Sequence, residues 1–172
     1  MLVGADDAEF AARLGTLLSG AAARLAGADA RDEVIANYRP AGMIPFIKRA
    51  PVLLPVERAW RLGVLLLDRQ ARLFETGEVT RAIETKWPSN RSLEVERRRQ
   101  VQAAAFRGPF EAGDVINVDA TPIDLAPVAL RVGSGPLSVR DGVLVVRWAS
   151  TPGGGTTPLE PYLADRIALL VD

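Results

Sequence analysis

The stretch LSVRDGVLVVRWA, residues 137–149, carries the strongest local structural signal in the chain. Two runs rich in strand-forming residues flank Asp141 and Gly142, and an Asp-Gly pair in such a setting is typical of a two-residue β-hairpin turn. The sequence therefore predicts two antiparallel strands around this pair. The neighbouring segments determine the kind of fold to which the hairpin belongs.

Three segments have the features of helices: residues 6–26, 92–107 and 158–170. Apolar side chains recur at helical spacing in the first and third. The second has acidic residues in its first turn and Arg107 in its last, which suits the helix dipole. The expected core-facing residues are Phe10, Leu14, Leu17, Leu18, Ala21 and Leu25, then Leu93, Val101, Ala104 and Ala105, then Leu159, Leu163, Ile167 and Leu170.

The segments between these helices have the patterns of strands. Strands are predicted at residues 61–67, 72–75, 78–83, 115–121 and 127–133, with Asp68 opening a turn. Because strands and helices come in blocks without strict alternation, the predicted fold class is α+β. We expect a mainly antiparallel sheet of about 6–8 strands with three helices, in a single domain covering residues 1–172.

Residues 38–56 contain four prolines, Pro40, Pro45, Pro51 and Pro55. This density predicts an extended segment that is neither a helix nor a central strand, because each proline lacks an amide donor. The segment packs along the edge of its own domain, or it forms an exposed apolar ridge that meets a protein partner. The interaction candidates are Met43, Ile44, Phe46, Ile47, Leu53 and Leu54.

Composition restricts the chemistry of the chain. Its 172 residues are 48% hydrophobic and 24% charged, as in an ordinary globular protein. The chain has no histidine and no cysteine, so it cannot supply a Ser-His-Asp triad, a thiolate nucleophile or a cysteine–histidine zinc site. We expect no cofactor. Whether the chain is an enzyme stays open, although its composition favours a protein that is not.

The glycine-rich stretch TPGGGTT, residues 151–157, precedes the third predicted helix. A phosphate-binding loop of the P-loop type requires a lysine after its last glycine, and no lysine follows Lys86. The stretch is therefore interpreted as a turn. A bound anion at the amides of Thr156 and Thr157 is the alternative, because helix N-termini attract negative charge.

Asp114, Asp119 and Asp124 are weak candidates for a metal site or for acid–base catalysis. Asn117, Asp119 and Thr121 would share one face of a regular strand, where they could hold Mg²⁺ together with a substrate phosphate. Two carboxylates facing a cleft could instead act on a sugar. The other interpretation is a solvated strand face, so no metal is expected.

The basic residues cluster between residues 48 and 107, a segment that contains 13 basic and 7 acidic residues. A basic helix face can neutralise nucleic-acid phosphates. However, the whole chain has no net charge, and three consecutive arginines point in different directions around a helix. Solvated arginines paired with nearby glutamates are the alternative. The basic-face candidates are Arg91, Arg97, Arg98, Arg99 and Arg107.

Together these patterns predict a cytoplasmic, bacterial-type binding domain without a membrane segment. Its expected partner is another protein or a second copy of the chain, and nucleic acid is not the expected partner. Two alternatives remain at this point. One is a carboxylate- and Mg²⁺-dependent enzyme for a phosphorylated or sugar substrate, and the other is a weak RNA- or DNA-binding module that uses residues 91–107.

Overall fold

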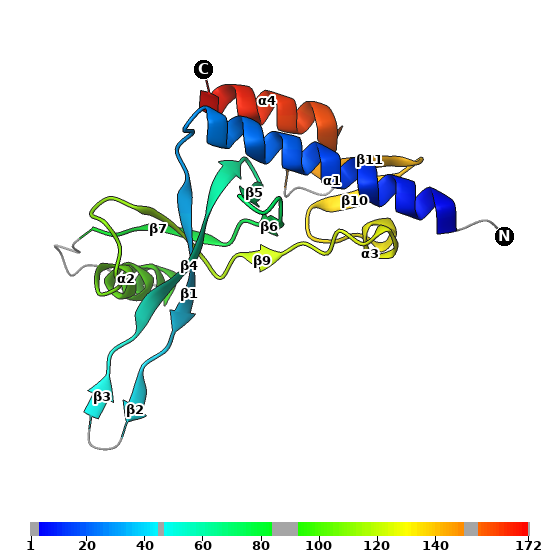
Figure 1. The fold of residues 1–172 in the computed structure, drawn as a ribbon. Coiled ribbons are helices and arrows are strands. Elements are labelled where there is room, and N and C mark those ends of the chain that lie inside the picture. The colour runs from blue at the N-terminus through cyan, green and yellow to red at the C-terminus, as the bar shows by residue number, and fades with distance from the viewer. Residues whose placement is uncertain (1–3, 45–46, 84–92, 150–154, 172) are drawn as a thin grey trace. The chain divides into compact units, whose positions relative to one another are not determined.

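The structure is a computed structural model that describes residues 4–44, 47–83, 93–149 and 155–171. Figure 1 shows the order of its helices and strands. The chain divides into two compact units, which we describe separately. The first unit comprises Met1–Asp32, Ala59–Glu75 and Thr121–Asp172, and the second comprises Glu33–Arg58 and Thr76–Ala120.

The fold is α+β, as predicted. The main sheet has seven strands in the order β7-β8-β1-β4-β5-β6-β9. Four of its pairings are antiparallel, namely β7/β8, β4/β5, β5/β6 and β6/β9, whereas β1 and β8 run parallel. A three-stranded sheet has the order β10-β11-β12, and β2 and β3 form a hairpin. The described residues contain four helices instead of the three expected.

The first unit contains three helices and most of the short strands. Its helices are α1 (Gly4–Gly27), α3 (Pro127–Val132) and α4 (Leu159–Val171). Its strands are the end of β4 (Val52–Leu62), β5 (Leu65–Asp68), β6 (Leu73–Glu75), β9 (Thr121–Pro122), β10 (Leu137–Arg140), β11 (Val143–Arg147) and β12 (Thr156–Pro158).

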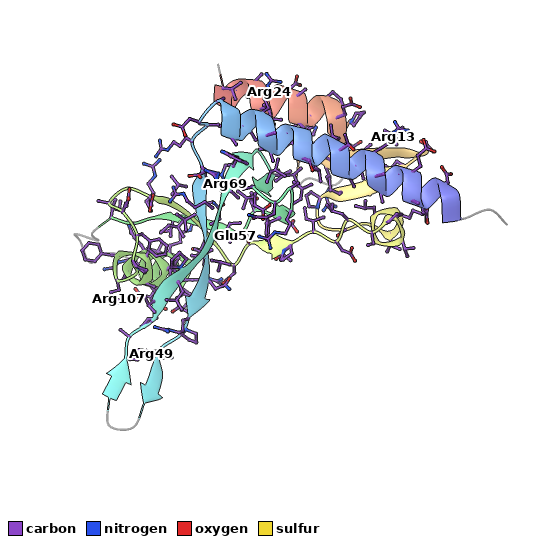
Figure 2. All side chains as sticks on the ribbon, viewed as in Figure 1. Arg13, Arg24, Arg49, Glu57, Arg69 and Arg107 are labelled. Atoms are coloured by element: carbon purple, nitrogen blue, oxygen red, sulfur yellow. The ribbon has the colours of Figure 1, made fainter. Side chains whose placement is uncertain are left out.

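The predicted apolar faces of α1 and α4 form the core of the first unit. Leu14, Leu18, Ala21 and Leu25 of α1 are buried together with Leu159, Leu163 and Ile167 of α4. Trp60 of β4 is also buried, and its indole nitrogen donates a hydrogen bond to the carbonyl oxygen of Ala30 at 3.0 Å. Arg69, which is labelled in Figure 2, stacks over the Trp60 ring at 4.9 Å and pairs with Asp32 at 3.2 Å.

Two turns in the first unit explain how its strands are joined. At the predicted hairpin, Asp141 and Gly142 have φ values of 49° and 76°, the positive values that a type I′ turn requires. The buried carboxylate of Asp68 opens the second turn. It accepts hydrogen bonds from the amides of Gln70 and Arg72, at 2.9 and 2.8 Å, and from Arg72 Nε at 2.6 Å.

The second unit contains a sheet covered by one helix. Its strands are β1 (Glu33–Arg39), β2 (Gly42–Ile44), β3 (Ile47–Arg49), the beginning of β4, β7 (Glu78–Arg81) and β8 (Val115–Val118), and its helix is α2 (Leu93–Phe106). Val101, Ala104 and Ala105 of α2 pack with buried residues of the strands, as predicted. Leu93 was expected on the same face of the helix, but it is 91% exposed.

Residues 127–132 form helix α3, so the strand prediction for this segment was wrong. Pro127 lies in the first helical turn, where its missing amide hydrogen costs nothing, and Gly133 ends the helix with a φ of 114°. The amide of Gly133 donates a hydrogen bond to the carbonyl oxygen of Ala129 at 2.8 Å. These terminal signals outweigh the β propensity of the valines, and only Leu130 is buried.

The predicted strand at residues 61–67 is interrupted by a turn. β4 ends at Leu62 and β5 begins at Leu65, and the two strands pair as a hairpin. Gly63 has a φ of 67°, which reverses the chain at this point. The residues of β5 are all buried, so this strand is covered on both faces.

The described residues of the segment 38–56 form β2, β3 and parts of β1 and β4, so the segment contributes to a central strand. β4 includes Pro55 and lies between β1 and β5 in the sheet. The exclusion of a central strand was therefore wrong. β5 pairs with Ala59–Leu62 of β4, so Pro55 lies on a part of β4 that does not pair with β5. The amide hydrogen that proline lacks is therefore not needed for a hydrogen bond between β4 and β5. The parallel strand β1 was not predicted at all.

Tyr162 connects α4 to the hairpin of β4 and β5. Its hydroxyl donates a hydrogen bond to the carbonyl oxygen of Leu62 and accepts one from the amide of Val64, both at 3.0 Å. A Cβ atom at Gly63 would overlap this hydroxyl. The contact therefore requires both a tyrosine at position 162 and a glycine at position 63.

We expect Tyr162→Phe to lower the free energy of unfolding by about 1–3 kcal/mol, because it leaves a buried amide and a buried carbonyl without a partner. Guanidinium unfolding measures the change. Tyr38→Phe is the matched control, because no hydrogen bond of the Tyr38 hydroxyl is present among the described residues. Equal effects of the two substitutions would contradict the structural role of the Tyr162 hydroxyl.

Candidate functional site

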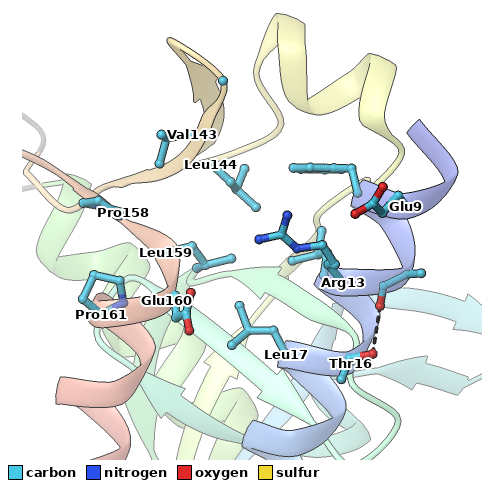
Figure 3. A pocket seen from close by; sticks show the side chains of 14 residues that line it. Glu9, Arg13, Thr16, Leu17, Val143, Leu144, Pro158, Leu159, Glu160 and Pro161 are labelled. Atoms are coloured by element: carbon cyan, nitrogen blue, oxygen red, sulfur yellow. Dashed lines mark hydrogen bonds between the residues drawn. The ribbon is translucent and has the colours of Figure 1, made fainter. Parts of the chain in front are cut away.

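A groove of about 740 Å³ lies in the first unit. This volume is within the range of roughly 300–1,000 Å³ that is typical of ligand sites. Helix α1 forms one wall, and the start of β11 with the start of α4 forms the other (Figure 3). We call it the α1 groove, and its lining residues are Glu9, Phe10, Ala12, Arg13, Leu14, Thr16, Leu17, Gly142, Val143, Leu144, Pro158, Leu159, Glu160 and Pro161.

Most of the lining is apolar, and each wall is positioned by a local feature of the sequence. Phe10 and Leu17 lie two turns apart on α1 and pack on the margin of the core while remaining partly exposed. The turn at Asp141 and Gly142 starts β11, which brings Val143 and Leu144 to the groove. Val143 is 47% exposed, so the groove presents apolar surface to solvent.

Three charged residues also line the groove: Glu9 and Arg13 on α1, and Glu160 in the first turn of α4. Figure 3 shows the Arg13 side chain extending from α1 into the groove. None of the three forms an ion pair within the described part of the chain.

The neighbouring acidic residue of α1 is already paired. Asp7 accepts hydrogen bonds from the guanidinium of Arg131 in α3. This hydrogen bond and the attraction of Asp7 raise the pKa of Arg131 above its ordinary value. Arginine is charged throughout the biological pH range, so Asp7 has a charged partner that Glu9 lacks in the described part of the chain.

A second, smaller pocket of about 160 Å³ lies in the second unit beside Asp119. It contains one ion pair, between Arg97 Nε and Glu78 Oε2 at 3.5 Å. Since these two charges satisfy each other, the pocket presents less free charge than its composition suggests. Its lining residues are Tyr38, Glu78, Arg97, Gln100, Val101, Val118 and Asp119.

The three candidate aspartates each accept a hydrogen bond from a backbone amide. Asp119 accepts from Tyr38 at 2.9 Å, Asp114 accepts from Glu111 at 3.0 Å, and Asp124 accepts from Ala126 at 2.9 Å. Asp114 also lies 3.8 Å from Arg58. Within the described ranges, no three acidic side chains are close enough to one another to hold a metal ion.

The expected strand face of Asn117, Asp119 and Thr121 does not form. β8 ends at Val118, and Asp119 has a φ of 53°, so the alternation of side chains stops there. The side chain of Asn117 is buried and donates to Glu33 at 2.7 Å. Thr121 lies in the separate strand β9.

Four of the basic-face candidates have partners, and Arg91 lies outside the described residues. Arg97 pairs with Glu78, Arg98 with Glu94 at 2.7 Å, and Arg99 with Glu96 at 3.7 Å. Arg107 donates to the carbonyl oxygen of Pro51 at 2.8 Å. Much of the positive charge of α2 is thus balanced by neighbouring carboxylates.

The interaction candidates of the proline-rich segment fall into two groups. Leu53 is buried in the core of the second unit and Leu54 is partly buried, so neither offers a fully exposed apolar surface. Phe46 lies outside the described residues, as do the side chains of Met43, Ile44 and Ile47. The backbone of the last three belongs to the β2–β3 hairpin.

Part of the glycine-rich stretch, residues 150–154, also lies outside the described residues. Thr156 and Thr157 lie in β12 and pair with Arg147 and Val146 of β11. α4 begins at Leu159, directly after this strand. Thr156 and Thr157 therefore belong to a strand that is antiparallel to β11, and not to the first turn of the helix.

Sequence reasoning did not identify the α1 groove. Phe10, Leu14, Leu17 and Leu159 were assigned to the core, which is where Leu14 and Leu159 lie. The available signal was the width of the apolar face of α1, which extends to Phe10 and Leu17 beyond the fully buried stripe.

We expect Asp119→Ala to lower the free energy of unfolding by about 1–2 kcal/mol, because alanine tolerates a positive φ less well and cannot accept from Tyr38. Asp119→Asn should stay within about 0.5 kcal/mol of the parent, since asparagine keeps both properties. Urea unfolding measures both. A melting temperature that rises with Mg²⁺ in the parent but not in Asp119→Asn would instead support a metal site.

None of the helices in the described residues is long and apolar enough to cross a membrane. Comparison with known proteins gave no matching family model, no matching curated protein and no matching solved structure.

Proposed function

We propose that this protein is a non-catalytic binding domain that docks an apolar segment of a protein partner in the α1 groove. The main support is the groove itself, which combines a ligand-sized volume with a mostly apolar lining. A protein segment suits this surface because apolar patches that remain exposed usually mark sites of protein interaction.

The exposure of individual residues agrees with this proposal. Phe10, Leu17 and Leu144 are only partly buried although they pack against the core. A partner that covers them together with Val143 would remove apolar surface from water, and each square ångström contributes about 25 cal/mol. Phe10 is the natural centre of such a contact, because aromatic residues dominate the energetics of interfaces.

The charges of the groove limit what can bind. Glu9, Arg13 and Glu160 lie on its walls without ion partners in the described chain. An occupant that is purely apolar would desolvate these charges without compensation, which is costly. The partner segment therefore carries polar or charged groups beside its apolar residues. Carboxylates, arginines and hydroxyls remain the main reactive groups of the chain, which has no histidine or cysteine.

Selection of peptides from a displayed random library tests this proposal. We expect the selected peptides to bind the parent protein and to bind Val143→Glu at least about tenfold more weakly, because a buried unpaired carboxylate costs more than the 1.4 kcal/mol that this factor represents. Val132→Glu is the matched control, since Val132 is 88% exposed on α3 and does not line the groove.

Pro161→Glu is a second groove variant, in case Val143→Glu perturbs the hairpin. Pro161 is exposed, and a carboxylate is favourable in the first turn of a helix. Circular dichroism establishes that each variant is folded. Peptides that bind the groove variants and Val132→Glu equally well would show that the α1 groove is not the docking site.

A further inference from the structure

Glu9 and Arg13 on α1 are charged, line the groove and have no ion partner in the described chain. Three other acidic residues of the first unit are paired: Asp7 with Arg131, Asp32 with Arg69, and Asp68 with Arg72. Glu9 and Arg13 also form no ion pair with each other, although residues four apart on a helix can do so. Both therefore remain available to an incoming partner.

The spacing of these charges defines the pattern that a partner must present. Residues four apart lie on one face of a helix, with a separation of about 6 Å along its axis. A complementary partner has a cation opposite Glu9 and an anion opposite Arg13. An antiparallel copy of α1 presents this pattern, because reversing the helix about Ala11 exchanges the positions of Glu9 and Arg13.

We propose that two copies of this protein associate through their α1 grooves, with the two α1 helices antiparallel and Glu9 of each copy paired with Arg13 of the partner subunit. The inference rests on the proposed function, because it names the occupant of the same groove. The arrangement is a two-fold interface, in which each contact occurs twice. If position 9 carried a cation, the interface would contain two contacts between like charges, one on each side of the two-fold axis.

The side chains around the two-fold axis permit a close approach of the helices. Ala12, which lines the groove together with Glu9 and Arg13, is exposed and small. Phe10, Leu17 and Val143 then supply the apolar contacts on either side, and the charges set the direction of the helices.

Glu160 extends from the start of α4 on the wall opposite α1 (Figure 3), and each copy brings its own Glu160 to the interface. The orientation of the two copies therefore depends on the pairing of Glu9 with Arg13, because charge complementarity disfavours arrangements that place like charges opposite each other.

Charge reversal tests the pairing. The parent protein is expected to form dimers in sedimentation equilibrium at low ionic strength, and the dimer should weaken as salt is added, because exposed charges are screened. Glu9→Arg alone and Arg13→Glu alone should each raise the dissociation constant at least about tenfold, because each places like charges opposite each other twice. The double variant Glu9→Arg/Arg13→Glu should regain the parent affinity to within about threefold.

Mixing the two single variants provides the decisive measurement. Glu9→Arg opposite Arg13→Glu restores both opposite-charge contacts, so the mixture should form heterodimers although each variant alone is monomeric. The two chains differ in mass, so native mass spectrometry distinguishes the heterodimer from either homodimer. Arg24→Glu is the control, since Arg24 is exposed on α1 outside the groove (Figure 2) and its reversal should leave the dimer unchanged.

A parent protein that stays monomeric at low salt and high concentration would overturn the dimer, whereas peptide binding to the groove would remain testable on its own. A dimer that tolerates both single reversals, or a mixture that forms no heterodimer, would overturn the antiparallel pairing. Failure of the peptide selection together with an intact charge-reversal pattern would instead limit the groove to self-association.

Discussion

The contact between Tyr162 and the turn at Gly63 joins α4 to the strands of the first unit. One hydroxyl satisfies the amide of Val64 and the carbonyl of Leu62, and the glycine provides both the positive φ and the space that this contact needs. It fixes α4 on the hairpin of β4 and β5. Since α4 begins at Leu159, the same contact positions the wall of the α1 groove that carries Leu159 and Glu160.

Local patterns in the sequence predict much of the fold because they depend on neighbouring residues. The Asp141-Gly142 turn and the apolar stripe of α1 are encoded within a few residues, and both appear as expected. The predictions were wrong where the signals at the end of an element or a contact in the tertiary structure determine the local conformation. Pro127 and Gly133 bound a helix in a valine-rich segment, and Gly63 divides one apolar run into two strands. Pro55 lies in a central strand, at a position that does not pair with β5.

The candidate site was less predictable because its residues are distant in the sequence. Phe10, Leu144 and Leu159 each follow a pattern of burial, and nothing local indicates that they border a common groove. The sequence also does not distinguish an intrahelical pair from two free charges. Glu9 and Arg13 have the spacing of an ion pair within one helix, but in the described structure they form no ion pair.

The division of the chain into interleaved segments affects how the protein is made. α1 and α4 share one core, yet residues 28–158 separate them in the sequence. At roughly 5–20 residues per second, the ribosome completes α4 about ten seconds after α1. During that interval the part of the apolar stripe of α1 that packs with α4 lacks this cover. Apolar surface that is exposed in this way during synthesis favours aggregation.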